Sequence, residues 1–170
     1  DIAGMTPKEQ LKQITKQTHD LVEEQYRIYN HSLLPQLKIN GVRVIKEHEQ
    51  LSEAEAEYVD RYYEENIYPV LTPMAVDSSR PFPLIRNKSL NIGALVRKKD
   101  GGEILEFATV QVPSVLPRII ELPGEEGERL LIPLEEVIER NIEKLFLNYE
   151  IVCAHPFRIM RNADLTIEED

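Results

Sequence analysis

The chain has 170 residues and a formal net charge of -10, with 42% hydrophobic and 29% charged residues. This composition is typical of a folded globular chain and excludes disorder for most of the sequence. The acidic balance disfavours nucleic acid and anionic membranes as general partners, so a polyanion would need a local basic patch. The single cysteine, Cys153, excludes an internal disulfide and a multi-cysteine zinc site, and it fits a reducing compartment.

The sequence shows no signal peptide, and no apolar run approaches the ~20 residues that a membrane-spanning helix needs. Its first residues, Asp1 to Gly4, and its last, Glu168 to Asp170, resemble cuts made inside a longer chain. We therefore expect a cytoplasmic segment of a larger protein.

A long helix is predicted to begin at Thr6-Pro7-Lys8-Glu9, where Thr6 caps the helix, Pro7 suits the first helical position and Glu9 completes a capping box. Apolar residues then follow at helical spacing: Leu11, Ile14, Leu21, Val22, Tyr26, Tyr29 and Leu33. Pro35 is expected to break or kink this helix. A helix of this length is expected to pack against something beyond its own hairpin partner.

The first 66 residues are predicted to form mostly a helical hairpin. Gly41 is the expected end of the first helical region, and residues 42–45 read as a short strand. A second capping box, Ser52 to Glu55, begins a helix that continues to about Asn66.

Residues 67–83 contain four prolines, so no helix is expected to run through them, and their apolar content predicts a packed extended segment. Alternating residues at 90–97, a turn at Asp100-Gly101-Gly102 and a returning strand at 104–112 predict a hairpin.

A second hairpin is predicted from residues 118–122 and 129–132. Pro133 begins a third helix with glutamates in its first turn, and residues 149–159 form a last strand that is expected to be broken at Pro156. The order of elements predicts an α+β fold, in which an N-terminal helical hairpin is followed by a mostly antiparallel sheet with one further helix. We expect 1–66 to be the helical segment that enters an α+β domain at 67–170 and to pack with it as one unit.

The four histidines have no metal-binding spacing, and His19 and His31 are expected on the surface of the long helix. His155 precedes Pro156-Phe157-Arg158, and a histidine beside an arginine could be a phosphorylated nucleophile. Because no base or orienting carboxylate is near in sequence, a strand histidine with local hydrogen bonds is the favoured interpretation. Cys153 lies in an apolar run and is predicted to be a core thiol. The motifs GxxxxGK[ST], GxGxxG and GxSxG are absent from the sequence.

Basic residues gather beside the proline-rich segment, at a hairpin end and on the last strand: Arg80, Arg86, Lys88, Arg97, Lys98, Lys99, Arg158 and Arg161. These side chains could bind a phosphate chain or an acidic partner surface. Solvated strand ends that pair with the many acidic residues are the simpler interpretation.

Several segments resemble the large bacterial polyphosphate kinase that works through a phosphohistidine: YPVLTPMAVD (68–77), RPFPLI (80–85), SLNI (89–92), VPSVLPR (112–118), IPLE (132–135) and HPFRIMRNAD (155–164). The helix start TPKEQL (6–11) fits as well. The segments follow the family's order and cover nearly the whole chain. None is a catalytic signature alone, and their combination identifies the family.

The resemblance implies that this chain is the middle (head) domain with the helix that enters it. The family's phosphohistidine, its partner histidine, its magnesium-binding positions and most nucleotide-binding positions belong to C-terminal domains, and an asparagine that contacts the nucleotide lies before Asp1. The resemblance therefore implies no catalytic, cofactor-binding or metal-binding residue in this chain, and a fragment that is inactive alone. The parent enzyme would use ATP and magnesium to transfer the terminal phosphate of ATP reversibly to inorganic polyphosphate.

The implied role is structural: contacts to the remaining domains of the parent, contacts to a second subunit of a homo-oligomer, and part of the wall of an active-site tunnel. The alternative is a module that guides polyphosphate through a local arginine patch, with candidate polyphosphate or interdomain contacts at Arg80, Arg86, Lys88, Arg158 and Arg161. A third hypothesis is an independent phosphotransferase that uses His155. The implied location is cytoplasmic, with peripheral contact at the inner membrane face, and neither nucleic acid nor a membrane span is expected.

Overall fold

The computed structural model describes residues 4–76, 85–100, 104–124 and 127–160. The chain divides into two compact units, Asp1–Val44 with Gly124–Leu130, and Ile45–Pro123 with Leu131–Asp170. This division falls after Val44, whereas the sequence analysis placed a boundary after residue 66. The packing of 1–66 with 67–170 as one unit stays a prediction.

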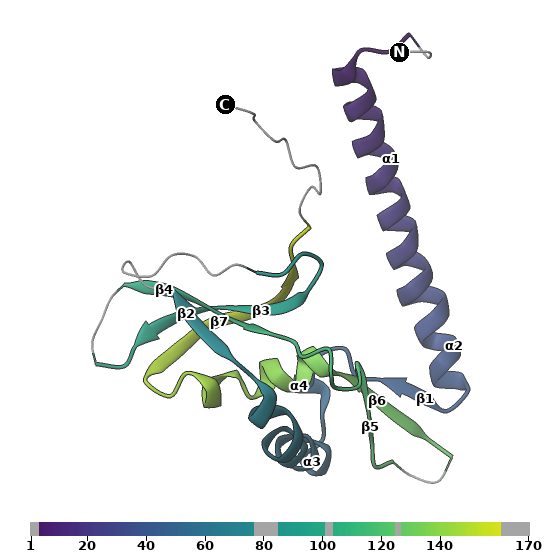
Figure 1. Ribbon diagram of the computed structural model, residues 1–170. Coiled ribbons are helices and arrows are strands. Elements are labelled where there is room, and N and C mark those ends of the chain that lie inside the picture. The colour runs from purple at the N-terminus through teal and green to yellow at the C-terminus, as the bar shows by residue number, and fades with distance from the viewer. Residues whose placement is uncertain (1–3, 77–84, 101–103, 125–126, 161–170) are drawn as a thin grey trace. The chain divides into compact units, whose positions relative to one another are not determined.

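The first unit is built on α1 (Pro7–Ile28), a π-helical turn η1 (Tyr29–Leu33) and α2 (Leu34–Ile39) (Figure 1). The predicted capping box is confirmed, because the Thr6 hydroxyl accepts a hydrogen bond from the amide of Glu9, whose carboxylate accepts one from the amide of Thr6. No residue of α1 is buried. The amphipathic pattern therefore predicted the helix correctly, although its apolar stripe is exposed.

Pro35 does not end the helical region, so of the two expected outcomes, a break or a kink, the break is wrong. The amide of Leu34 donates to the carbonyl of Tyr29, five residues earlier, which is the wider hydrogen bond of a π-helix. Pro35 then lies in the first turn of α2, where a missing N–H is tolerated. The region ends at Asn40, and Gly41 adopts the left-handed backbone (φ 76°) expected of a helix stop.

The second unit contains a four-stranded antiparallel sheet of β2 (Pro73–Val76), β3 (Leu90–Lys98), β4 (Leu105–Gln111) and β7 (Tyr149–Arg158) in the order β2-β4-β3-β7 (Figure 1). The predicted β3–β4 hairpin pairing is confirmed. The turn residues 101–103 lie outside the described part of the chain.

Strand β7 runs through Pro156 without a break, which corrects the sequence prediction. Pro156 pairs with Ile92, and β7 is the edge strand of the sheet, where a proline does not interrupt a second ladder. The irregularity in this strand lies elsewhere: Leu95 pairs with Cys153 and Val96 with Ile151, so a bulge forms at this point.

A second sheet has the order β1-β6-β5, formed by β1 (Val42–Val44), β6 (Arg129–Pro133) and β5 (Ile119–Leu122). The predicted strands at 118–122 and 129–132 are thus confirmed. After β6, α4 (Leu134–Arg140) and a 3-10 turn η5 (Ile142–Leu145) follow.

Helix α4 packs against β3 and β7 and contributes buried side chains to the core. The buried side chains of this core include Ile92, Val110, Ile132, Val137 and Ile138, each with 0% exposure. Apolar burial of this extent is the main stabilising contribution in a globular unit.

Helix α3 (Glu53–Tyr62) follows a 3-10 turn η2 (His48–Gln50) and begins at the predicted capping box, in which Ser52 and Glu55 exchange hydrogen bonds. It continues as a π-helical turn η3 (Tyr63–Ile67) and a 3-10 turn η4 (Tyr68–Val70) before β2. The extended segment predicted from residue 67 therefore starts with a short 3-10 turn.

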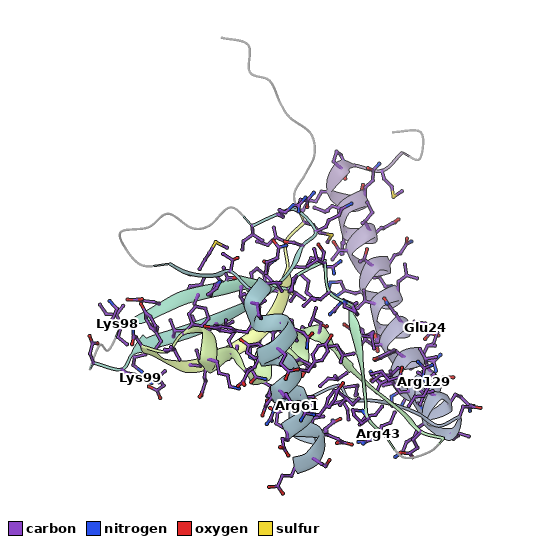
Figure 2. The ribbon with its side chains drawn as sticks, turned by 60° about the horizontal axis from the view of Figure 1, so that its bottom comes forward. Glu24, Arg43, Arg61, Lys98, Lys99 and Arg129 are labelled. Carbon is purple, nitrogen blue, oxygen red and sulfur yellow. The ribbon has the colours of Figure 1, made fainter. Side chains whose placement is uncertain are left out.

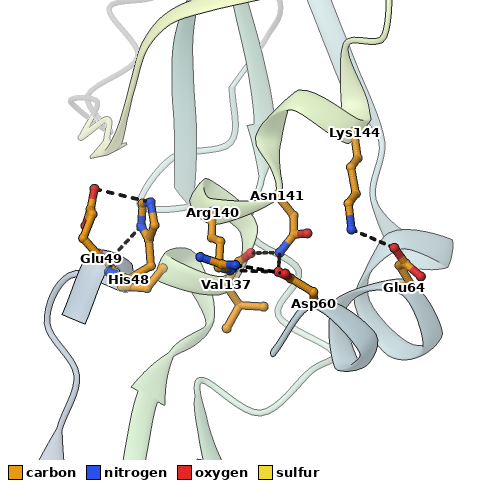
Figure 3. A network of polar contacts seen from close by, with 9 residues as sticks. His48, Glu49, Asp60, Glu64, Val137, Arg140, Asn141 and Lys144 are labelled. Atoms are coloured by element: carbon orange, nitrogen blue, oxygen red, sulfur yellow. Dashed lines mark hydrogen bonds and ion pairs between the residues drawn. The ribbon is translucent and has the colours of Figure 1, made fainter. Parts of the chain in front are cut away.

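A polar network joins α3 to the end of α4 (Figure 3). The guanidinium of Arg140 donates to both carboxylate oxygens of Asp60 at 2.8 and 3.0 Å, and the Asn141 amide donates to Asp60 Oδ1 at 3.0 Å. Burial acts to raise the pKa of Asp60, but the hydrogen bonds from Arg140 and Asn141 outweigh it and lower the pKa. Lys144 and Glu64 form a further ion pair at 2.7 Å.

The α+β class, with a long N-terminal helix, further helices and largely antiparallel strands, is confirmed. Among the described helices, none combines the length and the apolar character needed to cross a bilayer.

Candidate anion-binding pocket

A depression of about 430 Å³ opens at one end of the four-stranded sheet. The antiparallel order brings the start of β3 together with the ends of β4 and β7: Leu90 pairs with Arg158, and the amide of Val112 donates to the Leu90 carbonyl at 2.9 Å. Four cationic side chains from separate parts of the chain line the depression: Arg86, Lys88, Arg118 and Arg158. We refer to these four residues and the depression as the basic pocket.

A tight turn before β3 positions Arg86 and Lys88. The amide and the hydroxyl of Ser89 both donate to the carbonyl of Arg86, at 3.2 and 2.8 Å. Lys88 has a left-handed backbone (φ 62°), uncommon for a residue with a side chain, and its amide donates to the carbonyl of Ile159 at 2.8 Å. The turn is therefore held against the end of β7.

Arg118 comes from the loop between β4 and β5. Its carbonyl accepts a hydrogen bond from the amide of Leu134 at 3.0 Å, and its guanidinium is ion-paired with Glu135 in the first turn of α4. Burial lowers the pKa of Arg118, and the positive charge of Arg158 lowers it further. The two guanidinium groups therefore repel one another within the basic pocket.

The basic pocket has the opposite charge to the chain as a whole. No aspartate or glutamate is among the described residues that line it, although the chain carries a net charge of -10. Within the described residues, no carboxylate forms an ion pair with Arg86, Lys88 or Arg158. The hydroxyl group of Ser114 adds a neutral donor to the lining, whereas that of Ser89 already donates to the Arg86 carbonyl. This combination of cations and a hydroxyl donor suits a multiply charged oxyanion.

The structure brings together three of the five residues that the sequence analysis proposed as contacts: Arg86, Lys88 and Arg158. The other two, Arg80 and Arg161, lie outside the described residues. Arg118 was missed, because nothing in its local sequence separates it from an ordinary strand-end arginine. Its place in the family-like segment VPSVLPR was the one signal that could have indicated it.

Lys98 ends β3 and Lys99 follows it, whereas Leu90 at the other end of this strand lines the basic pocket. Both lysines are labelled in Figure 2. Lys98 is ion-paired with Glu106 at 3.4 Å, and the ammonium of Lys99 donates to the Leu147 carbonyl at 3.2 Å. Here the interpretation as paired strand-end residues is confirmed.

The predicted surface positions of His19 and His31 are confirmed, since both are exposed. His155 is on β7 with its side chain 80% exposed, and its Nδ1 lies 3.8 Å from Glu139 Oε1. Cys153 is exposed, so its prediction as a core thiol is wrong. An edge strand with one open face explains this result, because apolar neighbours in sequence do not ensure burial there.

His48 lies beside the carboxylates of α4, with Nδ1 3.3 Å from Glu136 Oε2. Burial and the nearby charge of Glu136 raise the pKa of Glu139, whereas His155 and His48 act in the opposite direction. No group of three or more histidine, cysteine or acidic side chains in the described ranges has an arrangement that could hold a metal ion.

Comparison with family models gives matches over most of the chain. Residues 54–170 match the polyphosphate kinase middle domain, and residues 1–45 match the polyphosphate kinase N-terminal domain. A crystal structure of polyphosphate kinase from Porphyromonas gingivalis is similar with a TM-score of 0.78 and 27% identity, over 93% of this chain and 25% of that chain.

Curated relatives agree with these matches. Polyphosphate kinase from Halalkalibacterium halodurans is 45% identical over 99% of this chain and 24% of its own length. Polyphosphate kinase from Exiguobacterium sibiricum is 44% identical over 98% of this chain and 23% of its own length. The chain thus spans about a quarter of the length of these relatives, and it belongs to the polyphosphate kinase family as a segment that matches the N-terminal and middle domains.

Proposed function

We propose that this chain is a supporting segment of an enzyme that reversibly transfers the terminal phosphate of ATP to inorganic polyphosphate. The match of residues 54–170 to the family's middle domain is the observation that carries the proposal. The phosphohistidine, the magnesium ions and most of the nucleotide site belong to parts of the parent outside this chain. The segment contacts those domains and a second subunit, and it forms part of the wall of the active-site tunnel.

The exposed position of His155 supports a role outside the chemistry. A nucleophile in phosphoryl transfer needs an orienting partner and cationic groups around the transferred phosphate. The Glu139 carboxylate lies 3.8 Å from Nδ1 of His155, which is too far for a hydrogen bond that would orient the ring, and its negative charge would repel an incoming phosphoryl group.

Radiolabelled ATP tests the proposal. The parent enzyme, incubated with magnesium and ATP labelled on the terminal phosphate, is expected to form polyphosphate and an acid-labile phosphoenzyme, and the chain alone is expected to form neither. The His155→Ala variant of the parent is expected to keep both activities. Label on His155 would favour the independent phosphotransferase instead, and a parent that forms no polyphosphate would contradict the proposal. Sedimentation of the parent as a monomer would contradict the second-subunit contact.

A further inference from the structure

We infer that the basic pocket is a binding site for a linear phosphate chain, with Arg86, Lys88, Arg118 and Arg158 as its cationic contacts. This inference deepens the proposed function and rests on it for the identity of the ligand. It assigns to this segment a direct contact with substrate or product, in addition to its supporting role.

The positive charge of the basic pocket favours an anionic ligand. Four cations share a depression of about 430 Å³, and none of the described residues that line it is acidic. Like charges that share a depression are unfavourable without a counter-ion. Burial is the main cause of the lowered pKa of Arg118, and the positive charge of Arg158 lowers it further. Of the four cations in the basic pocket, only Arg118 has a carboxylate partner among the described residues, namely Glu135. An anionic ligand would therefore neutralise charge that the chain itself leaves uncompensated.

The backbone that carries these cationic residues is held in place. The backbone around the cations is fixed by hydrogen bonds: the Arg86–Ser89 turn, the Lys88–Ile159 contact and the Leu134–Arg118 contact. A backbone that is already held by hydrogen bonds loses little further freedom when a ligand binds, which favours a specific site over diffuse attraction. The cations come from three separate segments of the chain: the turn before β3, the loop before β5 and the end of β7. Several cations from separate segments suit a ligand that carries more than one negative charge.

The lining also separates the candidate ligands. Among the described residues, no aromatic side chain lines the basic pocket, so these residues offer no aromatic stacking surface for a nucleobase. Polyphosphate and the triphosphate of a nucleotide share the chemistry that the cations recognise, but only the nucleotide would need a site for its base. An acidic peptide spaces its carboxylates more widely than a phosphate chain spaces its charges, so a small pocket with four cations favours the phosphate chain.

Binding of medium-length polyphosphate to the 170-residue chain tests the inference directly. The measurement is titration calorimetry at several salt concentrations, with backbone amide shifts to locate the site. We expect saturable binding with shifts at residues 86–90, 112–118 and 158. The double variant Arg86→Gln/Arg158→Gln should bind at least about tenfold more weakly, and the slope of log affinity against log salt should fall by roughly 1.5, as expected for two lost cationic contacts.

A matched double variant, Arg61→Gln/Lys99→Gln, removes the same number of charges from the same unit. Arg61 lies on α3 and Lys99 at the other end of β3, and both are labelled in Figure 2. This control should bind polyphosphate with wild-type affinity. Equal weakening in both double variants would overturn the inference, because it would show only general attraction. Circular dichroism confirms that each variant is folded.

Competition experiments identify the class of ligand that the basic pocket binds. Tripolyphosphate is expected to compete with polyphosphate for the site, whereas ATP at equal concentration should compete no better than tripolyphosphate. Tighter binding of ATP, with shifts that tripolyphosphate does not cause, would replace the phosphate chain by a nucleotide. Displacement of polyphosphate by poly-glutamate at matched charge would indicate an acidic peptide and overturn the inference.

Activity of the parent enzyme separates this inference from the proposed function. A parent that forms polyphosphate normally, but whose segment does not bind polyphosphate, leaves the proposed function intact and overturns the inference. A parent without polyphosphate synthesis overturns the proposed function, even where the segment binds polyphosphate.

Discussion

The two compact units use their apolar residues in different ways. In the first, α1 carries an amphipathic stripe in which Leu11, Leu21 and Tyr26 are 65%, 71% and 61% exposed. In the second, Ile92, Ile132 and Ile138 have no exposed surface. The comparison shows that helical spacing of apolar residues predicts a helix but does not predict what covers its apolar face. The second unit contains its own core, whereas α1 relies within this chain on local capping and length.

Truncation of the core should have the largest effect. Ile138→Ala removes a fully buried side chain from α4 and should lower the free energy of unfolding by about 2–5 kcal/mol. The matched change Leu21→Ala on α1 should alter it by less than about 0.5 kcal/mol. Urea unfolding followed by circular dichroism measures both. Similar losses in the two variants would show that α1 is packed as firmly as α4, contrary to the comparison.

The network of Figure 3 offers a polar counterpart in the second unit. Asp60→Ala removes the partner of Arg140 and Asn141 and should cost about 2 kcal/mol at neutral pH. The pKa of Asp60 is lower in the folded state, so its contribution is present above the ordinary pKa of 3.8 and is lost as the pH falls through the folded value. The difference between variant and wild type should therefore shrink in acid.

Urea unfolding at pH 7 and at pH 3 measures this prediction. Glu57→Ala on the exposed side of α3 serves as the control and should have little effect at either pH. A loss for Asp60→Ala that is as large in acid as at neutral pH would exclude the charged hydrogen bonds as its cause.

A substitution at Gly41 tests what stabilises the first unit. Its φ is 76°, and a Cβ would lie 2.7 Å from the Gly127 carbonyl oxygen. Gly41→Ala should therefore cost about 1–2 kcal/mol, through backbone strain and this contact. Gly127→Ala is the matched control, because its φ is 89° but nothing lies within 4 Å of its Cβ position.

Amide exchange reports the stability of this unit, since the amide of Arg129 donates to the Gly41 carbonyl at 2.7 Å. Exchange at Arg129 should be faster in Gly41→Ala than in Gly127→Ala. Equal rates in the two variants would assign the whole cost to backbone strain and contradict the predicted contact.

The smallest expected effect concerns Glu139. Burial and the charge of Glu136 raise its pKa, so its ionised form costs stability once the pH rises above the ordinary value of 4.5. His155, His48 and Glu49 also act on this carboxyl, the two histidines by lowering its pKa. Glu139→Gln should therefore stabilise the chain at pH 7, by on the order of 0.5 kcal/mol.

Below pH 4.5 the Glu139→Gln variant and the wild type should converge, because the carboxyl is then protonated in both states. Thermal unfolding across this pH range measures the difference. The exposed neighbour Glu143→Gln should show no such pH dependence. A destabilised Glu139→Gln variant at pH 7 would mean that the histidine contacts outweigh burial.

Much of the fold and part of the site followed from local signals. Both capping boxes, the Gly41 stop and the alternation along β3 depend on neighbours a few residues apart, so the sequence contains the information directly. The basic residues of the site were recognisable in the sequence as a charged group. Of the five residues predicted there, the structure places Arg86, Lys88 and Arg158 in the basic pocket.

Other features depended on tertiary position. Pro156 is tolerated because β7 is an edge strand, and Cys153 is exposed on that strand although its neighbours in sequence are apolar. Arg118 enters the site only because its loop returns beside the end of β7 and Glu135 holds its guanidinium. The sequence alone determined the helices, the strands and the family. Which cations meet, and which apolar residues are buried, was decided by the antiparallel strand order, because that order joins residues that local interactions cannot bring together.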